Sequence, residues 1–212
     1  MTQPELYLWQ DAAVALCEYA CGWEAGRGKD NPVYTAVTEG RDAPPNRAHY
    51  SSCGDLAHWL LERLGVREHW VNRASLGHYT VGANVWDLAS CPVAIKPSSV
   101  FIPVPGDILE IWNSAGGQDA HVCVCLAPPH DGKITLANYG AGGMNAANWP
   151  GAVIHDSSWR SSTAGNYIGT RKLQRVVQLA QIVPMCLAQP DLTGARVSGE
   201  LIDALSARWA ET

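Results

Sequence analysis

A cysteine, a histidine and an asparagine stand in this sequence where their side chains could carry out nucleophilic chemistry. Cys53 follows two serines and precedes a helical pattern, so we expect it in the first turn of a helix. Unpaired N–H groups and the positive end of the helix dipole favour a thiolate over a thiol at that place. Cys53 is therefore a candidate nucleophile, although free cysteine is also one of the residue types most often buried.

Two further residues could complete such a site. His121 opens a predicted strand directly after a polar loop, and Asn138 lies near the end of the next predicted strand. A nucleophilic thiol needs a base that later protonates the leaving amine, and the base needs an acceptor that fixes its tautomer. Adjacent antiparallel strands bring His121 and Asn138 side by side if both point to the same face. The pattern predicts Cys53 as nucleophile, His121 as base and Asn138 as the residue that orients the base.

The helices that must position these residues follow from the spacing of apolar side chains. Steps of three and four from Leu6 to Trp23 predict a first helix that ends near residues 26–28. The same steps predict a second helix over 52–64, which Gly65 ends. The same spacing predicts a C-terminal helix within residues 190–212, with Ser198 as its cap.

The strands follow from short runs of strand-forming residues. We expect strands over residues 108–112, 121–126 and 133–139, and the periodicity does not decide between strand and helix over 167–183. Glycine, proline and asparagine predict loops over 27–50 and 140–151. Asp107 is predicted to be a turn residue, because Pro-Gly precedes it. Helices followed by a meander of short strands indicate an α+β fold.

Length and composition bound the class of protein. The 212 residues are 47% hydrophobic and 17% charged, which is typical of a globular chain, and we expect one domain over residues 1–212. The candidate motifs lie within residues 30–140, and the C-terminal helix is an extension over about 190–212. A net charge of −5 with no basic cluster argues against nucleic acid as a partner, and no apolar run is long enough to span a membrane.

The start of the chain and its cysteines bear on location. The first five residues lack the basic region and apolar core of a signal peptide, so we expect synthesis in the cytoplasm. Seven scattered cysteines suggest no disulfide framework and agree with a reducing compartment.

Four blocks of the sequence resemble successive motifs of one family. They are CGDLAHWLLERL over residues 53–64, PGDIL over 105–109, HVCV over 121–124 and DGKITLANY over 131–139. Their order and gaps are similar to those of CHAP, the cysteine, histidine-dependent amidohydrolases/peptidases, and of the related NlpC-type cell-wall peptidases. CHAP proteins often have Glu at the third catalytic position, where this chain has Asn138.

The resemblance implies both a fold and an activity. The family fold is papain-like, with the cysteine helix packed on a mainly antiparallel sheet, and most members cut amide bonds in peptidoglycan. It assigns Cys53, His121 and Asn138 as nucleophile, base and orienting residue, and it implies no cofactor or metal. The expected partner is a peptidoglycan peptide or another amide substrate. A protein made in the cytoplasm would reach the cell wall by phage lysis or through a secretion system.

Other interpretations of the same residues stay open. A strand carrying His121, Cys123 and Cys125 on one face, with Cys53 as fourth ligand, could bind a metal, although side chains on a flat strand spread too far apart to share one ion. The chain could instead be an intracellular papain-like thiol enzyme, such as a deamidase or peptidase acting on a protein. A catalytically silent binding domain is a third alternative.

Overall fold

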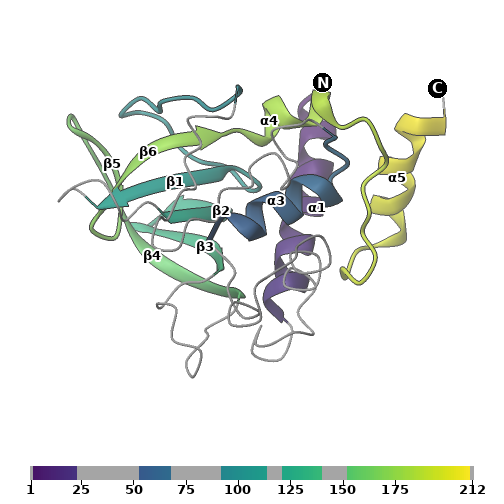
Figure 1. Cartoon of the computed structure of the whole chain (residues 1–212), viewed down its shortest axis with the longest axis horizontal. Coiled ribbons are helices and arrows are strands. Elements are labelled where there is room, and N and C mark those ends of the chain that lie inside the picture. Colours follow the sequence, from purple (N-terminus) through teal and green to yellow (C-terminus); the bar gives the residue numbers. More distant parts are fainter. Residues whose placement is uncertain (1, 23–52, 68–91, 114–120, 140–151, 211–212) are drawn as a thin grey trace, which may run out of the picture.

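The computed structural model describes residues 2–22, 53–67, 92–113, 121–139 and 152–210. Within these ranges a barrel of six strands forms one part of the molecule, and the helices gather beside it (Figure 1). The loops predicted over residues 27–50 and 140–151 lie outside the described residues. No described helix has the length and apolar character needed to cross a membrane.

The first two described helices are those that the apolar spacing predicts. α1 runs over Gln3–Gly22, and its start has a capping pair in which the Glu5 N–H donates to Thr2 Oγ1 at 3.4 Å. α3 runs over Cys53–Arg63 and ends as predicted at Gly65, whose φ is +91°. The N–H of Gly65 donates to Glu62 and that of Val66 donates to Leu61, which are the two bonds of a Schellman ending.

Six antiparallel strands form the barrel. They are β1 (Ile108–Asn113), β2 (His121–His130), β3 (Lys133–Tyr139), β4 (Ala152–Ser162), β5 (Gly165–Ile168) and β6 (Arg171–Val177). Each strand pairs with the next in sequence, and β6 pairs back onto β1. Asp131 and Gly132, both with positive φ, make the tight turn between β2 and β3.

Closure of this sheet corrects the predicted fold class. We expected a papain-like α+β fold, in which helices pack on a mainly antiparallel sheet, and that prediction is wrong. β1 and β6 pair from Ile108↔Val177 to Asn113↔Arg171, so the sheet closes into a barrel and has an interior of its own. The sequence pattern did not reveal β4, and it left β5 and β6 undecided, so the closing strands were missing from the prediction.

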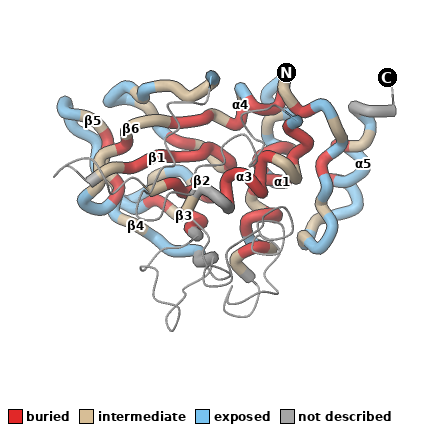
Figure 2. Tube along the Cα trace, in the orientation of Figure 1, coloured by how far each residue is buried: buried red, intermediate tan, exposed pale blue. Residues whose placement is uncertain are grey.

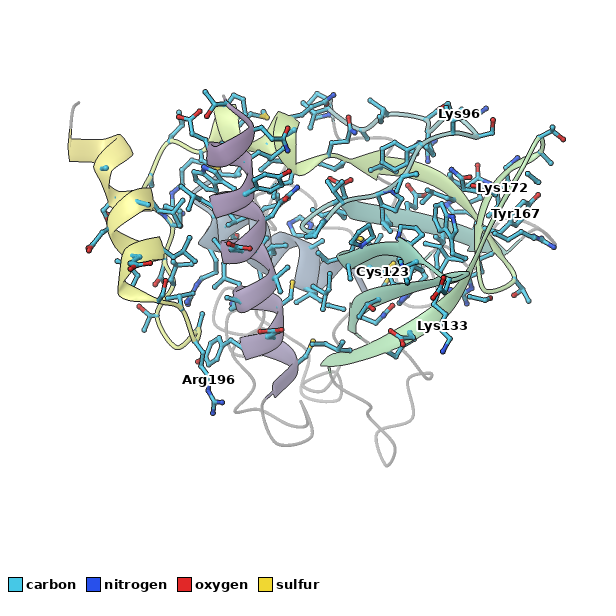
Figure 3. The ribbon with its side chains drawn as sticks, turned by 180° about the vertical axis from the view of Figure 1, so that it is seen from behind. Lys96, Cys123, Lys133, Tyr167, Lys172 and Arg196 are labelled. Atoms are coloured by element: carbon cyan, nitrogen blue, oxygen red, sulfur yellow. The ribbon has the colours of Figure 1, made fainter. Side chains whose placement is uncertain are left out.

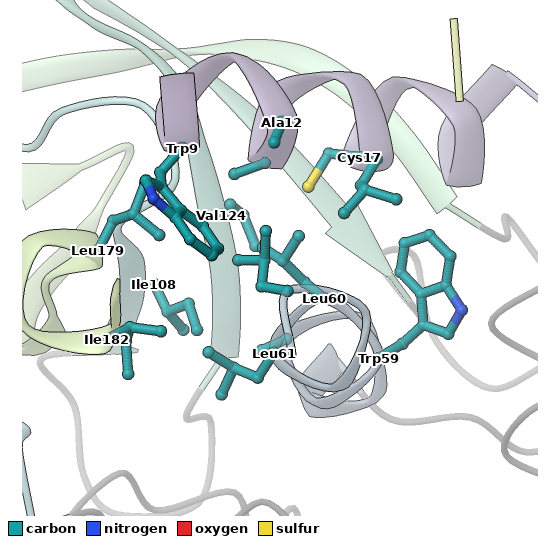
Figure 4. Packing of buried hydrophobic residues seen from close by; sticks show 14 of the residues in the cluster. Trp9, Ala12, Cys17, Trp59, Leu60, Leu61, Ile108, Val124, Leu179 and Ile182 are labelled. Carbon is teal, nitrogen blue, oxygen red and sulfur yellow. The ribbon is translucent and has the colours of Figure 1, made fainter. Parts of the chain in front are cut away.

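Two apolar clusters result from this closure. Buried residues lie both along the barrel strands and on the helices (Figure 2). The smaller cluster fills the barrel and includes Leu109, Cys123 and Leu136. The larger one joins the outer face of β1, β2 and β3 to the helices; close to its centre, Leu60 of α3 and Val124 of β2 lie beneath α1 (Figure 4). Alternate residues of one strand thus serve different clusters, as the two-residue period of a strand requires.

Asp107 joins the start of β1 to the helix that follows β6. It is a turn residue as predicted, with its N–H donating to Val104 O at 3.1 Å. Its fully buried carboxylate also accepts the N–H of Leu179 at 2.9 Å and that of Val104 at 3.1 Å. Leu179 begins α4 (Leu179–Ile182), which continues into η4 (Val183–Met185). Burial raises the pKa of Asp107 to about 6, against the lowering effect of the two backbone bonds.

The C-terminal helix packs back onto the first one. α5 covers Gly199–Ala210, and the Leu201 N–H donates to Ser198 Oγ at 3.2 Å, which confirms Ser198 as the cap. Leu201 and Leu205 belong to the larger apolar cluster, and α5 contacts α1.

Candidate active site

Cys53 is the first residue of α3, where the sequence places it. Its side chain is half-buried and packs against the larger apolar cluster, and α3 contacts both β2 and β3. The first turn of a helix lies at the positive end of the helix dipole, where a negative charge is stabilised. The two serines that precede Cys53 lie outside the described residues.

Cys53 interacts electrostatically with Cys123 of β2. A charge on Cys53 is one cause of the raised pKa of Cys123, second to burial of the Cys123 thiol itself. Cys123 is buried among the strands of the barrel (Figure 3), and its thiol donates to Leu109 O at 3.8 Å. This interaction agrees with the contacts that α3 makes with β2 and β3.

His121 is the first residue of β2 and is half-buried. It pairs with Ile111 of β1 and shares a strand face with Cys123, two residues further on, which is part of the barrel interior. Asn138 of β3 pairs with Cys123 and is only 2% exposed. The register therefore places His121 and Asn138 on the same face at one end of the barrel.

The two side chains are joined by a hydrogen bond. Nε2 of His121 lies 2.7 Å from Oδ1 of Asn138. An amide oxygen can only accept, so Nε2 carries the proton and the lone pair of the neutral ring is on Nδ1. This is the side-by-side arrangement that the sequence predicts for adjacent antiparallel strands.

The surroundings of His121 favour its neutral form. Burial is the largest cause that lowers the pKa of His121, and the hydrogen bond that His121 donates to Asn138 opposes that effect. The positive charge of Arg171, on the first position of β6, lowers the pKa of His121 further, as does His155. A neutral imidazole near pH 7 can accept a proton, as a general base must.

Two residues that the sequence did not single out extend this pair. Nδ2 of Asn138 lies 3.2 Å from Nδ1 of His155, and Nε2 of His155 lies 3.0 Å from Ser157 Oγ. Both residues belong to β4, which pairs with β3 through Leu136↔His155. The sequence does contain one signal for this strand. His155, Ser157 and Trp159 stand at every second position, so in a strand their side chains would share one face.

The other cysteines differ from Cys53 in their surroundings. Six cysteines are described and all are free thiols. Cys17, Cys123, Cys125 and Cys186 are buried, and burial raises the pKa of Cys21 to about 12. Among the described residues there is no group of three or more His, Cys, Asp or Glu side chains that could hold a metal ion.

The described chain thus joins His121 to Asn138 and places the Cys53 helix against their two strands. Comparison of the chain with known protein families, with curated proteins and with solved structures found no match.

Proposed function

We propose that this protein is a cysteine hydrolase that cleaves amide bonds of bacterial peptidoglycan through a thioester intermediate. The observation that carries the proposal is the 2.7 Å bond between His121 Nε2 and Asn138 Oδ1, on two strands that the Cys53 helix contacts. It supplies an oriented, neutral base beside a helix that begins with a cysteine.

The first half of the reaction forms the acyl-enzyme. Nδ1 of His121 takes the proton of the Cys53 thiol, and the resulting thiolate attacks the carbonyl carbon of the scissile amide. The negative charge that develops on the carbonyl oxygen is held by the backbone N–H of Cys53. The imidazolium of His121 then gives its proton to the leaving nitrogen, the C–N bond breaks, and a thioester remains on Cys53.

The second half returns the enzyme to its starting state. Neutral His121 takes a proton from a water molecule, and the hydroxide attacks the thioester carbonyl. The C–S bond breaks, the carboxylic acid product leaves, and the proton returns from His121 to the sulfur. Asn138 accepts the Nε2–H bond throughout, so the ring presents Nδ1 to the sulfur in both halves.

The choice of substrate rests on the CHAP resemblance of the four sequence blocks. Peptidoglycan peptides offer amide bonds between amino acids, and between the sugar lactyl group and the peptide. The proposal covers both an endopeptidase and an amidase, and it requires no cofactor or metal.

Purified sacculi provide the test. The wild-type protein is incubated with sacculi, the released fragments are analysed by mass spectrometry, and Cys53→Ala serves as the control. We expect soluble fragments with new amine and carboxyl ends from the wild type and none from the variant. Cleavage or deamidation of peptides and proteins, with intact sacculi, would contradict the peptidoglycan substrate and identify the intracellular thiol enzyme instead. Fragment release that Cys53→Ala retains would contradict the cysteine mechanism.

A further inference from the structure

The hydrogen bonds around Asn138 form a chain that runs through three strands. His121 of β2, Asn138 of β3 and His155 of β4 are linked by separations of 2.7 Å and 3.2 Å, and Ser157 ends the chain at 3.0 Å. The amide of Asn138 stands between two imidazole rings, with its oxygen toward one ring and its NH₂ group toward the other. The orientation of this amide decides what each ring must do.

Two arrangements of the protons satisfy such a chain. In the first, His121 Nε2–H donates to Asn138 Oδ1, the Asn138 NH₂ group donates to His155 Nδ1, and His155 Nε2–H donates to Ser157. In the second the amide is turned over, its NH₂ group donates to His121 Nε2, and the proton of His121 moves to Nδ1. Only the first arrangement leaves a lone pair on Nδ1 of His121, which His121 needs to act as a base toward Cys53.

The distances favour the first arrangement. A separation of 2.7 Å is at the short end of the range for an N–H···O bond, and nitrogen pairs lie further apart. The 3.2 Å separation on the His155 side fits an N–H···N bond. The ring of His155 thus supplies an acceptor for the NH₂ group of an amide that is itself 2% exposed.

We propose that His155 is a positioning residue, which holds the Asn138 amide so that its oxygen faces His121 and thereby keeps Nδ1 of His121 available to Cys53. The inference rests on the proposed function for the role of Cys53, but the proton arrangement itself can be measured without any substrate. His155 is exposed, so water competes for its bonds and we expect a moderate effect when it is removed.

Nitrogen-15 NMR of histidine-labelled protein is the test, because it distinguishes the Nε2–H tautomer of a histidine from the Nδ1–H tautomer. The variants are His155→Ala and His155→Phe, which remove the acceptor, and His155→Asn, whose Oδ1 can replace Nδ1. His130→Asn is the matched control, since His130 is an exposed histidine at the other end of β2. Alkylation of Cys53 by iodoacetamide at pH 7.5 is measured on the same samples.

We expect a pure Nε2–H tautomer of His121 in the wild type, in His155→Asn and in His130→Asn. In His155→Ala and His155→Phe we expect a mixture of tautomers and about a 3- to 10-fold slower alkylation of Cys53. Circular dichroism identifies a variant that fails to fold, and the other removal variant then decides. An unchanged tautomer and an unchanged alkylation rate in a folded removal variant would overturn the role of His155.

The outcome is separable from that of the proposed function. A tautomer that responds to His155, in a protein that cuts no amide, would leave the positioning role standing and refute the hydrolase. Cleavage of sacculi by a protein whose His121 tautomer does not change in the His155 variants would support the hydrolase and refute the positioning role.

Discussion

Asp107 and Asn138 are two buried polar side chains of the same barrel with different kinds of partners. Asp107 accepts two backbone N–H groups, from Val104 and Leu179, and so holds a turn and a helix in place. Asn138 is bound on both sides by histidine side chains, His121 and His155. A buried polar group bound by backbone joins elements of the fold, whereas one bound by titratable side chains sets the protons on those side chains. The comparison assigns stability to the first residue and chemistry to the second.

Replacing Cys53 should have the largest effect on activity. We expect Cys53→Ala to lose all measurable turnover and to keep its fold, because one half-buried thiol at a helix end contributes little packing. Sacculus clearing measures the activity, and circular dichroism measures the fold. Cys21→Ala is a matched control, since Cys21 is a half-buried cysteine at the end of another helix and should keep full activity. Full activity of folded Cys53→Ala would mean that the nucleophile is another residue.

The histidine and asparagine variants should follow in a fixed order. His121→Ala should be nearly as severe as Cys53→Ala, because neither thiol deprotonation nor protonation of the leaving amine remains. Asn138→Ala should lose about 10- to 1,000-fold, since it orients the ring and transfers no proton. Rates of dye release from labelled sacculi give the order. An Asn138→Ala variant less active than His121→Ala would reverse the two roles.

Asp107→Asn should change stability and its pH dependence while the active site stays intact. The pKa of Asp107 in the folded protein, about 6, lies above the ordinary value of 3.8, so the folded state holds the proton more tightly than the unfolded state. The stabilising contribution is therefore complete below pH 3.8 and is lost as the pH rises through about 6. We expect the free energy of unfolding of the wild type, relative to Asp107→Asn, to fall by about 2 kcal/mol between pH 4 and pH 7.

Urea unfolding of both proteins at several pH values measures this difference. Asn cannot ionise, so the Asp107→Asn variant lacks the titration of this one group. It therefore serves as the reference for the wild-type protein at each pH. A difference that stays constant with pH, or that grows as the pH rises, would show that burial does not raise the pKa of the Asp107 carboxyl.

The smallest effect is expected from Arg171, which acts on His121 through charge. Its positive charge lowers the pKa of His121, so Arg171→Gln should raise that pKa. An NMR titration of His121 measures the change, with Arg160→Gln as the control because Arg160 is exposed on β4 and lies over Tyr167. A lower pKa of His121 in Arg171→Gln would contradict the electrostatic account of the site.

The sequence predicted the parts of the molecule that depend on local pattern. Apolar spacing placed α1 and α3, Gly65 ended α3, and three strand-forming runs gave β1, β2 and β3. β2 and β3 are consecutive strands joined by a tight turn. The sequence of this one hairpin was therefore enough to predict that His121 and Asn138 lie close together.

The closed barrel could not be predicted in the same way. β4 carries Ile154, Asp156 and Arg160 on exposed positions, so it lacks the apolar alternation that marks a strand. Closure also depends on pairing between β1 and β6, which are distant in the sequence, and no local pattern reports such a pairing. The contact between His155 and Asn138 could not be predicted for the same reason, because His155 lies on β4, the strand that the sequence pattern did not reveal.

The central claim is that His121 activates Cys53, and mapping of thiol reactivity tests it most directly. Wild-type protein and His121→Ala are treated briefly with iodoacetamide near pH 6, where ordinary thiols with a pKa of about 8.5 are mostly protonated. The labelled cysteines are then identified by peptide mapping. We expect Cys53 to be alkylated before the other cysteines in the wild type, and at least 10-fold more slowly in His121→Ala. Alkylation of Cys53 at the same rate in both proteins, or preferential labelling of Cys123 or Cys125, would contradict the account.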